Sequence, residues 1–414
     1  MTSTERASDP APDAGAGIEG AATPAALHHA FPGLNGMRAA GAIMVVATHT
    51  AFDTGKVVDG PAGALLGRMN AGVTIFFVLS GFLLSRPFFL AALQGLPQPS
   101  VRRYFWKRAI RILPLYWFVV VVVWATEPDN DGVITPVMWL RNLTLTQLYW
   151  PDLLPTGLTQ MWSLATEVAF YLLLPLFVLL VLGRARRFSE RRALVVLGLI
   201  AVAGVAWQAT VGPIPGREGH FEQWLPGYLP WFCIGMAFAV VSAADTVRTP
   251  RHVLARLAQD PAACWVAAFL VFAISATPVA GPLLLLPPTH WEAAARVTLF
   301  AIFGGLLVLP LVFGDLGEGR IRRFCNHRIP FFLGEISYGI FCVHLIVLHE
   351  VFRRTDYQAF SGDWGMVFAL TMAGTIALAT LTYYLIEVPA MRLRRFGPRE
   401  KTGRASATAP TSSH

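Results

Sequence analysis

The chain contains ten runs of apolar residues, and each is long enough to cross about 30 Å of hydrocarbon as a helix. The runs lie at about 37–55, 70–92, 110–126, 160–182, 193–211, 225–243, 262–281, 294–314, 330–350 and 364–387. Hydrophobic residues make up 55% of the chain and charged residues 14%, which is far from the balance of a soluble globular domain. Because the hydrocarbon core offers the backbone no hydrogen-bond partners, spans of this length form helices. We therefore predict an all-α polytopic membrane protein with about ten transmembrane helices.

Lysine and arginine residues fall mainly on one side of these predicted helices. With the N-terminus placed inside, 26 of the 33 basic residues lie in the two terminal segments and in the alternate loops that face the same side, and 7 lie on the other side. Cytoplasmic loops carry such an excess, so both termini are predicted to be cytoplasmic, in the cell membrane. The net charge of +8 is explained by basic residues in short loops beside the lipid bilayer. We therefore do not expect a nucleic acid as a partner.

We divide the chain into a membrane domain over 33–395 and two tails. Residues 1–32 are rich in Ala, Pro, Gly and acidic residues and lack the regions of a secretory signal, so a disordered tail that stays on the chain is predicted. A second disordered tail is predicted over 396–414. The four cysteines show no C-x-x-C spacing and no histidines at zinc-ligand intervals, and no metal is expected.

The first apolar run carries two ionisable side chains, Arg38 at its start and His49 well inside it. Eleven residues of helix return to nearly the same face, so the two side chains share one face about 16 Å apart along the axis. An imidazole buried that deep in a membrane is a functional-site hypothesis, and His49 is the leading catalytic candidate. The alternative is a histidine that hydrogen-bonds a neighbouring helix and only fixes packing.

A cluster of cations precedes the third run, in Y-F-W-K-R-A-I-R-I-L-P-L-Y-W. Arg103, Lys107 and Arg111 recur at helical spacing, and Arg108 lies three residues before Arg111. One interpretation is a cytoplasmic anchor that touches lipid phosphates. The other is a site for a phosphorylated cytosolic donor, since arginine binds phosphate in a two-point fashion.

Further polar side chains lie inside later runs. Glu167 lies about 9 Å from the outer start of its run, with Tyr171 one turn further on the same face. Counted along the helices, His49, Glu167 and His344 fall at a similar depth, which predicts one site. A structural network of His, Glu and Tyr is the alternative.

The last run ends with a carboxylate, Glu387, which is level with Arg38 and could form a structural ion pair with it. A carboxylate that orients an imidazole, which in turn takes a proton from a hydroxyl group, is the arrangement of general-base acyl transfer. The sequence has no G-x-S-x-G elbow, no P-loop and no H-E-x-x-H helix. A serine nucleophile, nucleotide hydrolysis and zinc proteolysis therefore lose support.

Six blocks of residues, in this order along the chain, resemble a known family. They are G-L-N-G-M-R-A with Arg38 eleven residues before His49, G-V-T-I-F-F-V-L-S-G-F-L-L-S (72–85), R-A-I-R-I-L-P-L-Y-W (108–117), W-S-L-A-T-E-V-A-F-Y (162–171), I-S-Y-G-I-F-C-V-H (336–344) and I-E-V-P (386–389). Over about 33–395 the chain resembles the acyltransferase type 3 family of integral membrane O-acyltransferases. Members of that family move acyl groups from cytosolic acyl-CoA to sugars and other hydroxyl acceptors.

The resemblance implies roles for several residues already singled out. Arg38 and His49 match the essential pair of the family, Arg108 and Arg111 match a cytoplasmic R-x-x-R associated with acyl-CoA, and Glu167 matches the glutamate of the fourth span. Three positions depart from the family pattern and affect acceptor specificity more than the reaction itself. They are Asn35, Thr74 and Val168, where acidic residues are common.

The sequence therefore predicts a membrane-bound O-acyltransferase, with acetyl-CoA as the expected donor. The phosphates of acyl-CoA are predicted to bind near Arg38, Arg103, Lys107, Arg108 and Arg111, and the acceptor is a sugar, a cell-surface glycan or a macrolide-type metabolite. Stand-alone members of the family, which this chain resembles, act on such acceptors. The alternative is a multi-pass transporter or exporter, which would also bury His and Glu at mid-membrane. A receptor would need a larger outer domain than the loops provide.

Overall fold

The computed structural model describes residues 31, 33–183, 188–213, 220–245, 253–283, 286–314 and 327–398. Within these ranges the chain forms helices and loops and no strand, so the predicted all-α fold is confirmed. Most of the two predicted tails lies outside the described residues.

All ten predicted apolar runs are helical. The corresponding helices are α2 (Leu34–Asp53), α4 (Gly72–Gln94), α5 (Val101–Thr126), α7 (Met161–Leu182), α8 (Glu190–Val211), α9 (Leu225–Asp245), α11 (Pro261–Ser275), α12 (His290–Phe313), α14 (Arg328–Glu335) with α15 (Ser337–Thr355), and α16 (Trp364–Thr382). Shorter helices lie between and after them: α3 (Gly60–Gly67), α6 (Pro136–Leu143), α10 (Val253–Leu257) and α17 (Val388–Arg392).

Seven helical stretches of the described residues are long and apolar enough to cross a membrane. The pair α14 and α15, which is bent by 70°, counts as an eighth if it forms one span. The other two predicted runs fall short for different physical reasons. Helix α11 has only 15 residues, whereas a perpendicular span needs about 20. Helix α2 has 20 residues but carries the polar side chains of Arg38, His49 and Asp53 among its apolar ones.

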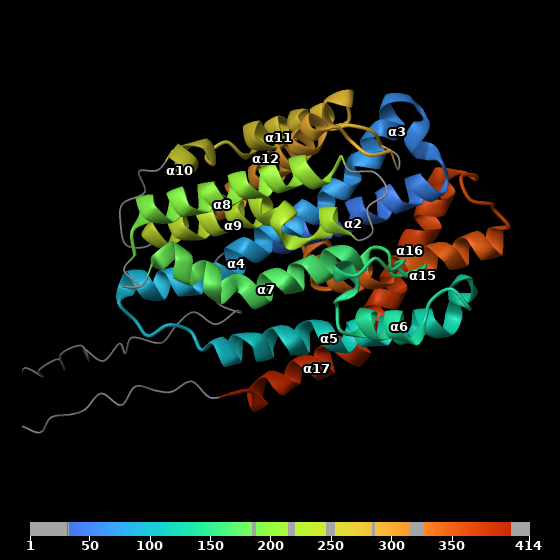
Figure 1. The fold of residues 1–414 in the computed structure, drawn as a ribbon, viewed down its shortest axis with the longest axis horizontal. Coiled ribbons are helices and arrows are strands. Elements are labelled where there is room, and N and C mark those ends of the chain that lie inside the picture. The colour runs from blue at the N-terminus through green and yellow to red at the C-terminus, as the bar shows by residue number, and fades with distance from the viewer. Residues whose placement is uncertain are drawn as a thin grey trace, which may run out of the picture.

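Helix α2 lies inside the bundle and organises it. It contacts α4, α14, α15 and α16, and Ala42, Val46 and Ala51 on it are fully buried. On one side of α4 lie α8, α9, α11 and α12, and α5 and α17 lie on the other (Figure 1). Below, the "Arg38 end" and the "His49 end" of the bundle mean the directions of these two residues along α2.

Helices α4 and α9 approach each other through glycines. A Cβ atom on Gly235 would lie 2.0 Å from the carbonyl oxygen of Val78, and one on Gly81 would lie 2.2 Å from that of Phe232. Small residues of this kind allow membrane helices to pack backbone against backbone.

We expect Gly235→Ala to destabilise the protein by about 1–3 kcal/mol, because the added methyl group forces two backbones apart. Unfolding of the purified protein by SDS titration in mild detergent measures the change. Gly198→Ala is the matched control, since a Cβ atom there meets no atom within 4 Å. Equal stability of the two variants would contradict this account of the helix contact.

Candidate active site

Two histidines from different helices meet inside the bundle. Nε2 of His344 in α15 lies 3.2 Å from Nδ1 of His49 in α2, and the ring centroids are 4.9 Å apart. His344 is completely buried. The structure thus brings together two of the three groups that the depth count predicted to share a level.

The backbone contacts of these rings assign their hydrogens. Nδ1 of His344 lies 2.8 Å from the carbonyl oxygen of Phe341, and Nδ1 of His49 lies 2.8 Å from that of Val45. A carbonyl oxygen only accepts, so each Nδ1 carries a hydrogen and Nε2 of the neutral His344 ring accepts from His49. Nε2 of His49 is then the nitrogen with a free lone pair, and it makes no hydrogen bond within the described part of the chain. This is the tautomer that a general base requires.

His49 also lines a cavity of about 230 Å³. Its walls include residues of α2 and α15 and residues at the starts of α4 and α7. Most of the lining residues lie toward the His49 end. The lining residues are Val45, Thr48, His49, Phe52, Gly67, Asn70, Val73, Gln160, Trp162, Ser163, Leu283 and Phe341. A reacting group therefore has space beside the imidazole.

Glu167 lies in a separate polar group. Its Oε1 accepts hydrogen bonds from the hydroxyl of Tyr171 at 2.6 Å and from Ser80 of α4. The expectation that Glu167 orients His49 therefore does not match the geometry, because the partners of His49 are Val45 and His344. Sequence reasoning did not single out Ser80, whose signal is a hydroxyl group inside the block 72–85.

Glu167 lies apart from His49 because of the position at which α7 begins. The side chain of Gln160, just before α7, donates to the carbonyl oxygen of Cys342 at 3.2 Å, and Cys342 is two residues from His344. The helix thus starts at the depth of the histidines and not at the membrane boundary. Glu167 lies seven residues further along it, about 10 Å toward the Arg38 end.

Arg38 is held in a chain of hydrogen bonds at its own end of the bundle. Its Nη1 donates to Oδ1 of Asn35 at 3.1 Å, and Nδ2 of Asn35 donates to Oε1 of Glu335 at 3.1 Å. The hydroxyl of Tyr383 donates to the other oxygen of Glu335 at 3.3 Å. Sequence reasoning missed Glu335, although a carboxylate at the start of the ninth apolar run was a signal for it.

Glu387 pairs with a different arginine from the one that the sequence suggested. Nη1 of Arg111 lies 2.5 Å from Oε2 of Glu387, and the carboxylate is almost fully buried. The proposed ion pair of Glu387 with Arg38 is therefore not formed. Helix α5 packs against the segment that carries Glu387 and supplies Arg111 as its cation.

Four arginines gather at this end, and we call Arg38, Arg108, Arg111 and Arg394 the arginine cluster. Each lies close enough to act electrostatically on at least one other member. Nε of Arg108 and Nε of Arg394 are buried without a hydrogen-bond partner within the described residues. Arg38 and Arg108 also act on the charge of Glu167. Buried guanidinium nitrogens without partners are costly, so they favour an anion as the missing partner.

Arg103 and Lys107 lie in the first two turns of α5, at the same end of the bundle as the arginine cluster.

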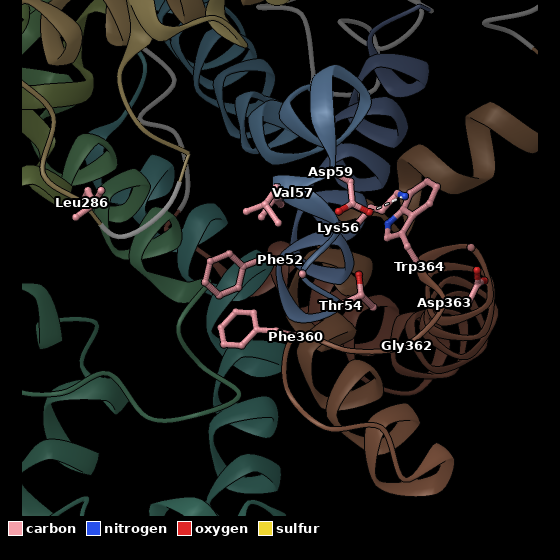
Figure 2. A pocket seen from close by; sticks show the side chains of 13 residues that line it. Phe52, Thr54, Lys56, Val57, Asp59, Leu286, Phe360, Gly362, Asp363 and Trp364 are labelled. Carbon is pink, nitrogen blue, oxygen red and sulfur yellow. Dashed lines mark hydrogen bonds and ion pairs between the residues drawn. The ribbon is translucent and has the colours of Figure 1, made fainter.

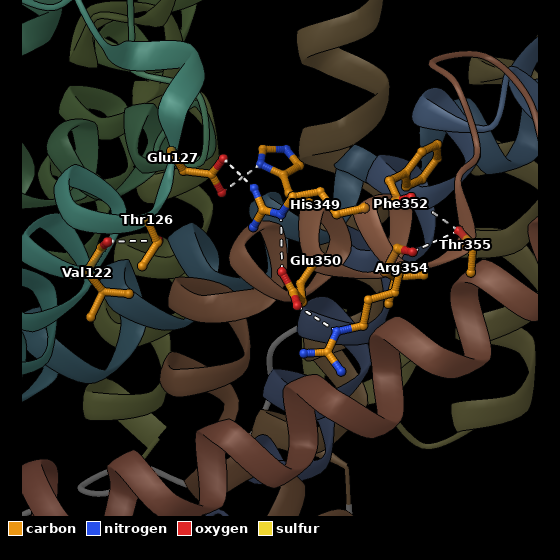
Figure 3. Close-up of polar contacts among 10 residues, drawn as sticks. Val122, Thr126, Glu127, His349, Glu350, Phe352, Arg354 and Thr355 are labelled. Carbon is orange, nitrogen blue, oxygen red and sulfur yellow. Dashed lines mark hydrogen bonds and ion pairs between the residues drawn. The ribbon is translucent and has the colours of Figure 1, made fainter.

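A third polar group lies at the His49 end (Figure 3). Glu127, just after α5, accepts from Nδ1 of His349 at 3.1 Å and from Nη1 of Arg353 at 3.2 Å, and it is only 2% exposed. Arg353 and Arg354 both bind Glu350 as well. These contacts fasten α5 to α15, the helix that carries His344.

The described residues contain no group of three or more His, Cys, Asp or Glu side chains that could hold a metal ion. No solved structure matches the chain significantly. The profile of the acyltransferase domain family, Acyl_transf_3, matches residues 31–384. The chain belongs to this family. The resemblance drawn from the six sequence blocks is thereby confirmed, and the protein is an acyltransferase with several membrane-spanning helices.

Individual relatives agree with this assignment. The chain is 28% identical to "Acyltransferase MdmB" of Streptomyces mycarofaciens, over 92% of this chain and 95% of the relative. It is 26% identical to "Nodulation protein 10" of Rhizobium leguminosarum bv. viciae, over 78% and 82%. It is 27% identical to "Putative peptidoglycan O-acetyltransferase YrhL" of Bacillus subtilis, over 87% of this chain and 55% of the relative.

Proposed function

We propose that this acyltransferase moves an acetyl or other short acyl group from cytosolic acyl-CoA to a hydroxyl group of a sugar, a cell-surface glycan or a macrolide-type metabolite. His49 acts as the general base. The observation that carries the proposal is the geometry of His49. Its Nδ1–H is held by Val45 and His344, its Nε2 has a free lone pair, and its ring lines a cavity.

The arginine cluster is the proposed site for the phosphates of acyl-CoA, with acetyl-CoA as the expected donor. The unpartnered Nε atoms of Arg108 and Arg394 support this, because phosphate oxygens would satisfy them. Arg103 and Lys107 extend the same positive surface at the start of α5. The excess of basic residues on this side supports a cytoplasmic location for the cluster and for both termini, in the cell membrane.

From the cluster, the thioester arm has to follow α2 for about 16 Å to reach His49. Glu167, with Ser80 and Tyr171, lies on this donor side of the histidines and remains a candidate site group there. The arginine cluster is close enough for the charges of Arg38 and Arg108 to act on Glu167, which supports a role in donor binding rather than in orienting His49.

The reaction follows from these positions. The acceptor hydroxyl oxygen attacks the thioester carbonyl carbon while Nε2 of His49 takes the hydroxyl proton. The carbon–sulfur bond then breaks, the new ester is released, and the imidazolium returns its proton to the CoA thiolate. During proton transfer, the Nε2 lone pair of His344 faces the Nδ1–H of the imidazolium and favours its charge.

Names of relatives support a carbohydrate acceptor. Besides the Bacillus protein, the chain is 28% identical over 200 residues to "Peptidoglycan O-acetyltransferase OatA" of Listeria monocytogenes. The alcohol hydroxyl groups of peptidoglycan belong mainly to its sugars. A sugar hydroxyl is therefore the first acceptor to test.

His344 is a positioning residue in this proposal, and its variants separate positioning from packing. We expect His344→Leu to slow acetyl transfer by about 10- to 100-fold, because the Nδ1–H of His49 loses one of its two acceptors and keeps only the carbonyl oxygen of Val45. His344→Gln, which offers an oxygen close to the position of Nε2, should recover much of the rate. Initial rates with labelled acetyl-CoA measure both. A glutamine variant no better than the leucine variant would contradict the role.

Purified protein in detergent, supplied with acetyl-CoA labelled in the acetyl group, tests the function as a whole. The acceptors are the GlcNAc–MurNAc disaccharide, a chitin oligosaccharide and a macrolide. Label that moves to an acceptor hydroxyl supports the proposal. No transfer to any of the three acceptors and no acetyl-CoA consumption would contradict the proposed donor and acceptors.

A further inference from the structure

An open pocket lies at the His49 end of the bundle. It has a volume of about 1040 Å³, at the upper end of the roughly 300–1000 Å³ that small-molecule sites occupy. It is formed by the end of α2 and the following turn, by Leu286, and by the loop before α16. The lining residues are Phe52, Thr54, Gly55, Lys56, Val57, Val58, Asp59, Leu286, Phe360, Gly362, Asp363, Trp364 and Gly365.

This pocket is next to the cavity of His49. Phe52 lines both spaces, and it lies one helical turn beyond His49 on α2. The two spaces are therefore adjacent, with the side chain of Phe52 in the wall of each. The arginine cluster lies in the opposite direction along the same helix.

Three aromatic rings surround the pocket (Figure 2). Phe52 and Phe360 lie together with ring centroids 5.7 Å apart in an edge-to-face arrangement, and Trp364 lies across from them. Trp364 is anchored by a hydrogen bond of 3.2 Å from its Nε1 to Oγ1 of the buried Thr50. The rings are thus set in place by α2 and are not loose surface groups.

Phe360 is held in an unusual conformation. Its φ of 63° is left-handed, a region that bulky residues rarely adopt, and its backbone N–H donates to the carbonyl oxygen of Asp53 at 2.7 Å. The residue is nevertheless 63% exposed, so burial does not compensate for this strain. Strained residues that expose a large apolar ring favour a binding function.

Polar groups lie between the rings. Lys56 and Asp59 form an exposed ion pair of 2.9 Å, and one oxygen of Asp363 accepts from the backbone of Met366 and leaves the other for a ligand. Aromatic faces flanked by carboxylates and an ammonium group suit a sugar, whose C–H face packs on rings while its hydroxyl groups form hydrogen bonds.

We propose that this pocket binds the acceptor as a sugar ring of a glycan, which enters from the end of the bundle opposite to the arginine cluster. The inference rests on the proposed function and adds the acceptor subsite to it. Donor and acceptor then approach His49 from opposite ends of α2. The hydroxyl group to be acylated extends past Phe52 toward Nε2 of His49.

A photoreactive GlcNAc–MurNAc disaccharide that carries a diazirine, with purified full-length protein and no acyl-CoA, tests the subsite. We expect crosslinks in peptides that contain residues 52–59 and 360–365, and competition by the unmodified disaccharide. Phe360→Gly should weaken this labelling by about fivefold to tenfold, because one aromatic contact is lost. Glycine suits the left-handed backbone at this position, so the variant is expected to fold.

Ala359→Gly is the matched control, since Ala359 is exposed and adjacent but does not line the pocket. Crosslinks elsewhere, competition by a macrolide only, or equal labelling of the two variants would overturn the proposal. Because the assay contains no donor, it separates the two ideas. Acetyl transfer without labelling of the pocket would contradict the acceptor subsite alone. Labelling without acetyl transfer would contradict the proposed function but leave the pocket as a sugar-binding site.

Discussion

Replacing His49 with alanine is expected to lower the rate of acetyl transfer by about 10²- to 10⁴-fold, the usual contribution of a general base. The loss follows from the tautomer, because Nε2 of His49 is the base that the contacts of Val45 and His344 leave available. Water in the cavity is a far weaker base and replaces it poorly. The rate constant kcat should carry most of the loss, since the ring takes no part in binding the distant phosphates.

His290→Ala is the control for this experiment. His290 begins α12, and its Nδ1 lies 2.7 Å from the carbonyl oxygen of Ala209, away from the histidine pair. Rates with labelled acetyl-CoA and the GlcNAc–MurNAc disaccharide, with folding checked by gel filtration, should differ between the two variants by at least 100-fold. A His49→Ala enzyme that keeps the activity of the His290→Ala enzyme would rule out His49 as the base.

The placement of Arg38 and His49 on one face of one helix could be predicted because it depends only on the helical period. The meeting of His49 with His344 was also predictable from the depth count, since α2 and α15 both run through the bundle beside each other. Ionisable residues are rare in the apolar runs of membrane helices, so their spacing is easy to recognise in the sequence.

The position of Glu167 was not predictable in the same way. The count assumed that α7 begins at the membrane boundary, whereas Gln160 binds the backbone of Cys342 in the middle of the bundle. Similarly, the pairing of Glu387 with Arg111 depends on where α5 packs, and the residue pattern of the run 364–387 does not indicate this. The depth at which a helix begins and the helices that pack beside it are properties of the tertiary structure. The sequence of a single helix does not determine them.

The second large effect is expected at the arginine cluster. Hydrogen bonds to charged groups contribute about 1.5–3 kcal/mol each, so Arg108→Ala should raise the KM for acetyl-CoA by about 10- to 100-fold. Arg108 is an informative member, because its buried Nε, like that of Arg394, is without a partner in the described part of the chain. The arginine bound to Glu387 would expose a buried carboxylate if it were removed, and its loss would confound binding with folding.

A donor without the nucleotide separates phosphate binding from every other cause of a raised KM. Acetyl-pantetheine carries the same thioester but lacks the phosphates, so the wild-type protein should use it poorly and the Arg108→Ala variant should use it equally poorly. Arg354→Ala is the control, since that exposed arginine lies at the His49 end and pairs only with Glu350 among the described residues. If Arg108→Ala impaired both donors to the same extent, the cluster would act on structure or on the acyl group. The phosphates of CoA would then have to bind elsewhere, which would remove the reason for placing the donor at the Arg38 end of α2.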